Sequence, residues 1–209
     1  MHPVRCRRTD QSMRYAYMRL CRLFALMVSL VCLMGAPALA ATIEGMHFDD
    51  AVRLDTSDLQ LNGVGLRAVF VIKGYVAGLY LSTRAATSNA ALAAPGPKRV
   101  QMRMLREAKA EDFKKALGAG MRKNSTEAEL VNLQDRINAF ELAIESIGIV
   151  RKGDTITLDY VPERGTTLAV NGSIKGHSIS GADFYGKLLE IFVGDNPVDL
   201  RLKKGLLGL

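Results

Sequence analysis

The segment 62–81, NGVGLRAVFVIKGYVAGLYL, limits the possible folds more than any other part of the 209-residue chain. It is rich in β-branched and aromatic residues and has glycines near both ends, a composition typical of β-strands. We expect strands at 59–72 and 75–82, joined by a tight turn near Lys73 and Gly74. The chain therefore contains a long β-hairpin.

One arginine, Arg67, lies inside this strand-forming segment. A guanidinium group keeps its charge at ordinary pH, so its burial is costly unless an anion or hydrogen-bond acceptors lie beside it. Two interpretations follow. Arg67 either forms a structural ion pair or belongs to a site that receives an anionic ligand.

Residues 1–40 have the layout of a cleavable secretory signal peptide. Six arginines precede an uncharged apolar run at 23–34, and Ala38 and Ala40 then form an Ala-x-Ala cleavage site. The apolar run is too short for a typical membrane span. We expect cleavage after Ala40 and a periplasmic or secreted product that has no stable membrane span.

Removal of this leader changes the composition of the chain. The leader contributes +5 of the formal net charge of +7, which leaves +2 for residues 41–209. The basic balance is therefore no argument for a nucleic-acid partner, and we expect none. All three cysteines also lie within the leader, so we expect no disulfide and no thiolate chemistry in the remaining chain.

Residues 41–209 are predicted to form one α+β domain. Thr126 and Glu129 form a capping box in front of the longest predicted helix, whose apolar residues follow a three-to-four spacing and should pack against a sheet. Asn171-Gly172 is a strong hairpin signal. Further strands are expected at 42–48, 51–54, 99–105, 155–161, 166–170 and 173–175. Helices are expected at 110–122, 127–146 and 180–193, with one helical turn at 90–93 and a tail at 194–209.

Few residues beyond the leader suggest catalysis. His47 and His177 are the only histidines there, and no metal-ligand spacing occurs, so we expect no metal site and no cofactor. No Gly-x-Ser-x-Gly motif is present. Gly63-Val64-Gly65 is not followed by a predicted helix and so is no dinucleotide-binding fingerprint.

An ordered set of short motifs resembles the chalcone isomerase superfamily, and most closely its secreted bacterial branch, the chalcone isomerase-like proteins. The resemblance implies an open-faced β-sandwich, in which a large antiparallel sheet is covered on one face by helices, with a ligand cleft between the layers. The motifs lie at 62–67, 75–81, 96–100, 112–113, 153–154, 158–162, 181–185, 192–199 and 202–208.

The resemblance also implies a role for Arg67. This residue matches the cleft arginine of plant chalcone isomerases, which is proposed to orient the substrate and to stabilise an oxyanion during ring closure. In related fatty-acid-binding members, the equivalent arginine holds a carboxylate.

Other positions of the plant active site differ in this chain. Tyr75 stands where the plant enzymes have a threonine, Phe113 replaces a tyrosine, Gly120 replaces an asparagine, and Ile191 replaces a threonine or serine. Oxyanion stabilisation needs several preplaced donors, and few remain here. The chain is therefore expected to bind rather than to catalyse.

We expect a periplasmic protein that binds a fatty acid, or a similar amphipathic organic acid or phenolic ligand, through Arg67, Tyr75 and Phe113. Two alternatives stay open. One is an isomerase of the intramolecular-lyase type that acts on an unsaturated carbonyl compound, with Arg67 as its catalytic residue. The other is a ligandless scaffold in the cell envelope. Candidate apolar walls of the cleft are Phe113, Leu117, Ile137, Phe140, Phe184 and Leu188.

Overall fold

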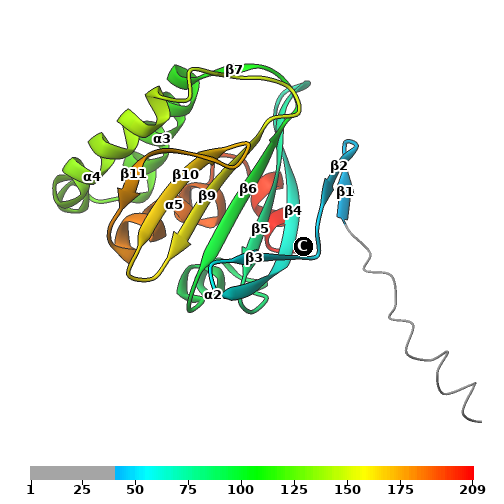
Figure 1. Cartoon of the computed structure of the whole chain (residues 1–209), viewed down its shortest axis with the longest axis horizontal. Coiled ribbons are helices and arrows are strands. Elements are labelled where there is room, and N and C mark those ends of the chain that lie inside the picture. The colour runs from blue at the N-terminus through cyan, green and yellow to red at the C-terminus, as the bar shows by residue number, and fades with distance from the viewer. Residues whose placement is uncertain (1–40) are drawn as a thin grey trace, which may run out of the picture. The chain divides into compact units, whose positions relative to one another are not determined.

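Seven antiparallel strands form the large sheet, in the order β11-β10-β9-β6-β5-β4-β3 (Figure 1). The computed structural model describes residues 41–209, and the predicted signal peptide lies outside them. The strands of the sheet are β3 (Ala51–Leu54), β4 (Ser57–Val69), β5 (Ile72–Leu81), β6 (Lys98–Met104), β9 (Thr155–Val161), β10 (Gly165–Val170) and β11 (Ser173–Ile179).

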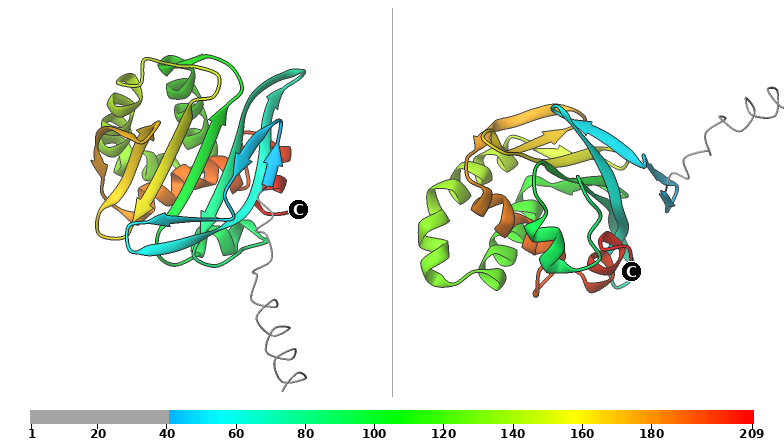
Figure 2. Two further views of the ribbon diagram at one scale, coloured as in Figure 1. Left: turned by 45° about the vertical axis from the view of Figure 1, so that its right-hand side comes forward. Right: turned by 90° about the horizontal axis from the view of Figure 1, so that it is seen from below.

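Helices cover one face of this sheet (Figure 2). They are α2 (Ser88–Ala93), α3 (Ala110–Asn124), α4 (Glu127–Glu145), α5 (Ala182–Val193) and α6 (Leu200–Leu206). Two short antiparallel strand pairs complete the secondary structure of residues 41–209. They are β1 (Ala41–Ile43) with β2 (Met46–Phe48), and β7 (Ala108–Lys109) with β8 (Ile149–Val150). The expected α+β, open-faced arrangement is confirmed.

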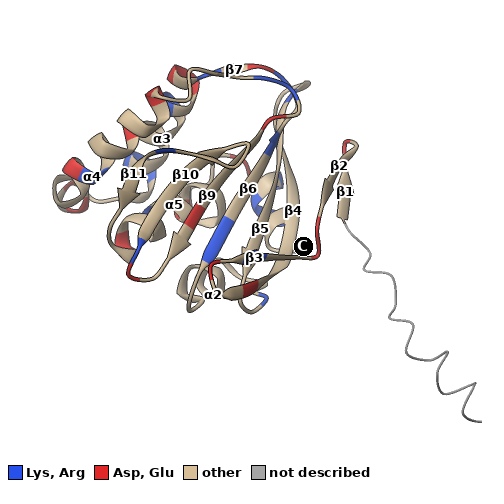
Figure 3. Cartoon of the chain, in the orientation of Figure 1, with Lys and Arg blue, Asp and Glu red and all other residues tan. Residues whose placement is uncertain are grey.

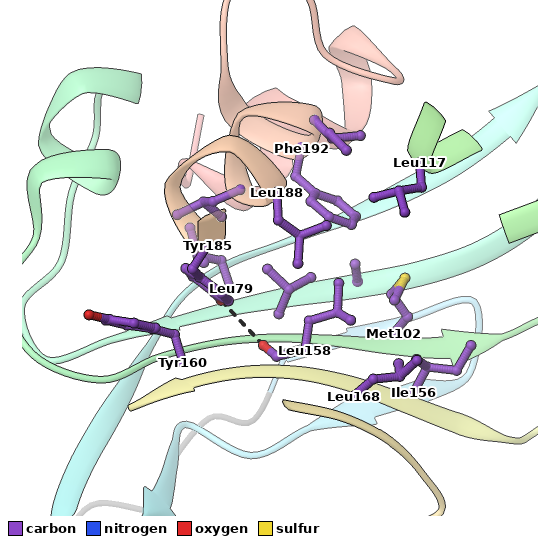
Figure 4. Close-up of a cluster of buried hydrophobic side chains, with 14 of the residues drawn as sticks. Leu79, Met102, Leu117, Ile156, Leu158, Tyr160, Leu168, Tyr185, Leu188 and Phe192 are labelled. Atoms are coloured by element: carbon purple, nitrogen blue, oxygen red, sulfur yellow. Dashed lines mark hydrogen bonds between the residues drawn. The ribbon is translucent and has the colours of Figure 1, made fainter. Parts of the chain in front are cut away.

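The main hydrophobic core lies between the sheet and the helices (Figure 4). Side chains alternate between the two faces of β5, so Ala77 and Leu79 belong to this core, whereas Val76 and Tyr80 belong to a smaller cluster with Phe48. Burial on both faces determines the register of β5, because a shift by one residue would exchange the two sets.

The capping box and apolar stripe predicted for α4, and the hairpin turn predicted between β10 and β11, are confirmed. The Thr126 hydroxyl accepts a hydrogen bond from the Glu129 N–H (3.3 Å), and the Glu129 carboxylate accepts one from the Thr126 N–H (2.8 Å). The apolar stripe of α4 is buried at Leu133, Ile137, Phe140 and Ile144. Asn171 and Gly172 form the turn between β10 and β11.

The predicted turn near Lys73 and Gly74 is wrong. The turn lies at Phe70 and Val71, with Phe70 in the left-handed region (φ 53°). Neither residue has high turn propensity. The turn is placed there because the pairing of β4 with β5, determined by core burial, makes Val69 face Ile72 across the strands.

Two other element predictions need correction, and one segment without a predicted element contains a helix. Residues 42–48 form two strands rather than one, because Glu44 and Gly45 adopt positive φ and reverse the chain between β1 and β2. The strand predicted at 173–175 extends to Ile179, where it pairs with Thr166. The tail at 194–209 contains the helix α6, which Asp199 caps at its N-terminus.

Candidate ligand-binding site

The C-terminal helix α6 lies directly on strand β4. A Cβ atom on Gly65 would be 2.5 Å from the Leu202 carbonyl oxygen, and one on Gly63 would overlap the Gly205 carbonyl oxygen. Backbone can approach backbone this closely only where side chains are absent. The glycines of the 62–67 motif therefore make room for α6.

Asn62, which lies on β4, is hydrogen-bonded both to the segment that follows β5 and to α6. Its side-chain amide donates to the carbonyl oxygens of Ala85 (2.9 Å) and Leu206 (2.7 Å), and its side-chain oxygen accepts from the Ala85 N–H (2.6 Å). Asn62 is buried, so these partners compensate for its removal from water. They hold the C-terminal helix in place at the strand that carries Arg67.

This docking brings Asp199 to Arg67. One Asp199 carboxylate oxygen is 3.4 Å from Arg67 Nη1, and the other accepts hydrogen bonds from the N–H groups of Arg201 and Leu202 at the start of α6. Arg67 Nη1 also donates to the Ala68 carbonyl oxygen (3.0 Å). The side chains of Arg67 and Asp199 are 22% and 9% exposed.

The Asp199 carboxylate is ionised at neutral pH. Desolvation favours its protonated form, but N–H donors from Arg201, Leu202 and Ala68, together with the Arg67 charge, outweigh this effect and lower its pKa. Arg67 uses only Nη1 in its contacts with residues 41–209, and its Nη2 and Nε atoms have no hydrogen-bond partner there. The ion pair therefore leaves two guanidinium nitrogens available to a ligand.

An outer cavity of about 370 Å³ lies beside Arg67. Its polar lining residues include Arg67, Tyr75, Arg106 and Asp112. Arg106 is exposed and forms no ion pair within residues 41–209. The outer cavity thus combines two guanidinium groups and the Tyr75 side chain with two carboxyl side chains, Glu107 and Asp112.

An inner cavity of about 90 Å³ adjoins the outer one. The two share Tyr75, Phe113, Ala116 and Val198 as lining residues, so these four side chains form the boundary between them. Every other residue around the inner cavity is apolar, and Figure 4 shows several of them between the sheet and the helices. These others are Met102, Leu117, Phe140, Ile144, Ile147, Ile156, Leu158, Leu168, Leu188, Ile191 and Phe192.

The Tyr75 hydroxyl is a neutral donor at this boundary. Burial raises the pKa of Tyr75 well above its ordinary value, the Arg67 charge partly opposes this effect, and Asp199 adds to it. Tyr75 is also the residue paired with Arg67 across β4 and β5. The two side chains therefore come to the same cavity through strand register.

The three predicted ligand-binding residues, Arg67, Tyr75 and Phe113, line the same outer cavity. Of the expected apolar walls, Leu117, Phe140 and Leu188 line the inner cavity, as does Phe113. Ile137 and Phe184 are buried in the core but border neither cavity.

Two residues of the site were missed from the sequence. Arg106 is the second residue after β6, and the pairing of Tyr75 with Met104 brings it to the cavity. Asp199 contacts Arg67 because α6 docks on β4. Asp199 is also a possible helix N-cap, and this signal could have predicted α6 from the sequence. It could not have predicted that Asp199 contacts Arg67.

Two of the four positions at which the resemblance leads us to expect a difference from plant chalcone isomerases, Gly120 and Ile191, form an apolar contact. A Cβ atom on Gly120 would be 2.8 Å from Ile191, so the two residues pack directly together. His47 and His177 are exposed and border neither cavity. Across residues 41–209, no cluster of His, Cys, Asp or Glu could hold a metal ion, and no helix is long and apolar enough to cross a membrane.

Comparisons with known proteins agree with this architecture. The sequence profile of the chalcone isomerase-like family matches residues 40–208. The chain is also similar to the crystal structure of a fatty-acid binding protein from Arabidopsis thaliana, with a TM-score of 0.63 and 15% identity, over 80% of this chain and 95% of that chain. No curated protein matches the sequence. At this identity the structural likeness establishes the fold.

Proposed function

Because this chain belongs to the chalcone isomerase-like family, we propose that it binds a fatty acid or a similar amphipathic carboxylate without catalysing a reaction on it. One observation carries the proposal. A cavity with two arginines at its outer end continues, past Tyr75 and Phe113, into a cavity lined by apolar residues. The structural neighbour named as a fatty-acid binding protein favours fatty acids among such ligands.

Arg67 and Tyr75 receive the carboxylate in this proposal. The free nitrogens of Arg67 can donate two parallel hydrogen bonds to a carboxylate, and the Tyr75 hydroxyl adds a neutral donor. Arg106 contributes a second positive charge to the outer cavity, whose lining also includes the acidic residues Glu107 and Asp112. Since Asp199 neutralises part of the Arg67 charge, the ligand competes with an internal carboxylate.

The inner cavity receives the hydrocarbon tail. It has several times the room that one water molecule needs, yet apart from the Tyr75 hydroxyl its lining side chains offer no polar group to hold water. Such a cavity favours an apolar occupant. At about 90 Å³ it admits only part of a long alkyl chain, so we expect side chains at the boundary, such as Phe113, to move when the ligand enters.

The same geometry weighs against the two alternatives. An intramolecular lyase needs several donors around a developing oxyanion, whereas Gly120 and Ile191 supply none and Phe113 has no hydroxyl. A phenolic ligand could occupy the cavity but would make less use of Arg67. A ligandless scaffold has no need for charged residues that converge at the mouth of an apolar cavity.

Export to the periplasm or beyond the cell is part of the proposal. It rests on the arginine-rich leader, the apolar run at 23–34 and the Ala38-x-Ala40 site. N-terminal sequencing of the protein recovered from its host should give Ala41 as the first residue. A cytoplasmic product that retains the leader would contradict this part of the proposal.

Equilibrium binding of hexadecanoate tests the function. Arg67→Ala should weaken binding by roughly 1.5–3 kcal/mol, because a charged hydrogen-bonded contact is lost. Arg67→Lys should have an intermediate effect, since it keeps the charge without the bidentate geometry. Tyr75→Phe should cause a smaller loss than Arg67→Ala, and the exposed Arg53→Ala is the matched control.

The methyl ester of hexadecanoate separates the two roles of Arg67. The parent protein should prefer the acid to the ester, and the Arg67→Ala variant should bind the two about equally. If Arg67→Ala lowers the free energy of unfolding but leaves the affinity for the acid unchanged, Arg67 serves only as the partner of Asp199.

A further inference from the structure

The tip of the β4–β5 hairpin carries four exposed apolar side chains. Phe70 and Val71, the turn residues, are 94% and 91% exposed, and their neighbours Val69 and Ile72 are 50% and 53% exposed. Phe70 and Val71 are the most exposed large hydrophobic residues within 41–209. Consecutive apolar residues at a turn are unusual, because turns favour glycine, proline and short polar residues.

The tip projects beyond the rest of the sheet. Strand β6 ends at Met104, opposite Tyr75, and β3 pairs only with residues 57–60 of β4. Beyond Tyr75, β4 and β5 are paired as strands only with each other, apart from one hydrogen bond between Leu105 and Gly74, and Figures 1 and 2 show the hairpin extending past the end of β6. Nothing within residues 41–209 covers Phe70 or Val71.

This tip adjoins the mouth of the proposed ligand site. Val69 and Ile72 line the outer cavity together with Arg67 and Tyr75, whereas Phe70 and Val71 do not. The exposed apolar surface is thus continuous with the entrance through which a lipid-like acid would pass.

Basic residues lie in loops at the same end of the sheet as the tip. Arg106, Arg151 and Lys152 lie in loops at this end of the sheet, are exposed and form no ion pair within residues 41–209. The Gly74 carbonyl oxygen of the hairpin accepts from the Leu105 N–H (2.9 Å), so the loop that follows β6 lies beside the hairpin. The Met104 carbonyl oxygen accepts from the Gly153 N–H (2.8 Å), so the loop that carries Arg151 and Lys152 lies beside the end of β6. Figure 3 shows blue segments in the loops around β7, at the same end as the tip.

The charge at this end is mixed. Lys73 pairs with Glu44 (2.7 Å), and the acidic residues Glu107 and Asp154 also lie there. The positive excess is therefore small. For a lipid surface, insertion of apolar side chains therefore has to supply most of the affinity, and attraction between basic residues and anionic lipid supplies less.

A bilayer fits this surface better than a protein partner does. A stable protein interface buries about 800 Å² on each side, and a narrow projecting turn of four residues cannot supply that area. Apolar side chains flanked by basic ones match the interfacial region of a membrane, where they reach about 5–10 Å into the boundary between headgroups and acyl chains.

We propose that the tip, Val69–Ile72, docks the protein on the surface of a lipid bilayer and places the mouth of the outer cavity against it. The docking would let an amphipathic acid pass between membrane and cavity without crossing water. The statement about the transferred acid depends on the proposed function, whereas membrane docking itself does not.

Tryptophan fluorescence tests insertion directly, since the chain contains no tryptophan. Phe70→Trp should show a blue shift, and quenching by brominated acyl chains, when vesicles of phosphatidylethanolamine and phosphatidylglycerol are added. Val131→Trp, at an exposed apolar position on α4, should show neither. Any contribution of residues 1–40 to vesicle binding is the same in both variants. Equal responses, or no response from Phe70→Trp, would overturn the proposal.

A second variant separates docking from ligand binding. The double variant Phe70→Ser, Val71→Ser should bind these vesicles about tenfold more weakly than the parent, because two apolar side chains no longer insert. The control Val131→Ser, Leu142→Ser should bind them like the parent. The Phe70 and Val71 variant should still bind hexadecanoate in vesicle-free solution with parental affinity.

These measurements distinguish the two proposals. Vesicle binding that depends on Phe70, in a protein that binds no hexadecanoate, would support docking and contradict the proposed function. Hexadecanoate binding without any vesicle binding would overturn docking alone. A Phe70→Trp response that requires added protein instead of lipid would assign the tip to a protein interface and also overturn docking.

Discussion

Arg67 and Asp199 form an ion pair at 3.4 Å, although 132 residues separate them in the chain. The pair joins the strand at the edge of the cavity to the first turn of the C-terminal helix. It also combines the two interpretations that the sequence leaves open for Arg67. The guanidinium group is hydrogen-bonded through Nη1, and the same residue lines the outer cavity.

Asp199→Asn should increase the affinity for hexadecanoate. Asparagine is as good a helix N-cap as aspartate, so α6 should stay in place. The change removes the carboxylate that competes with the ligand for Arg67. Calorimetric titration should show a gain of about fivefold, the equivalent of a partly exposed ion pair of about 1 kcal/mol. Weaker binding would mean that Asp199 positions Arg67 for the ligand.

The stabilising effect of Asp199 should depend on pH. Because its pKa is lowered in the folded protein, the carboxylate contributes stability above its ordinary pKa of 3.8 and loses that contribution as pH falls through the folded value. The difference in unfolding free energy between the parent and Asp199→Asn should therefore be constant near neutral pH and shrink below about pH 4. Denaturant titrations across this range measure it. A difference that grows on acidification would contradict the assignment.

Gly65→Ala should destabilise the protein. The added Cβ would lie 2.5 Å from the Leu202 carbonyl oxygen, and backbone cannot move aside without lifting α6 from β4. We expect a loss of roughly 1–3 kcal/mol in a denaturant titration.

Gly186→Ala is the matched control for this substitution. Gly186 lies within α5 and has no atom within 4 Å of the position of a new Cβ. It should leave stability unchanged or raise it by up to about 1 kcal/mol, through helix propensity. Similar effects of the two changes would show that α6 is not held closely on β4.

Phe140→Ala should cost roughly 3–5 kcal/mol, as expected for a buried aromatic residue. Phe140 is 3% exposed and packs edge-on against Phe184, with ring centroids 5.5 Å apart. Val131→Ala, on the exposed side of the same helix, should change stability by less than about 0.5 kcal/mol. A loss below about 1 kcal/mol for Phe140→Ala would contradict the role of this face in the core.

Local chemistry alone was enough to predict much of the fold. The strand predicted at 99–105, the capping box at Thr126 and Glu129, and the hairpin signal at 171–172 each depend on neighbours within a few residues. Arg67 could be singled out for the same reason, because a permanent charge in a strand-forming segment requires a partner wherever that segment lies.

Tertiary structure decided the features that depend on distant parts of the chain. Burial on both faces of β5 set the strand register, and the register placed the turn at Phe70 and Val71 against their turn propensities. The partner of Arg67 depends on a helix that docks where glycines leave β4 bare, and Arg106 reaches the cavity only because β6 ends opposite Tyr75. Sequence by itself determined which residues need partners. Only tertiary packing, which brings Leu206 to Asn62 and Asp199 to Arg67 from more than a hundred residues away and leaves no local pattern, determined which partners they have.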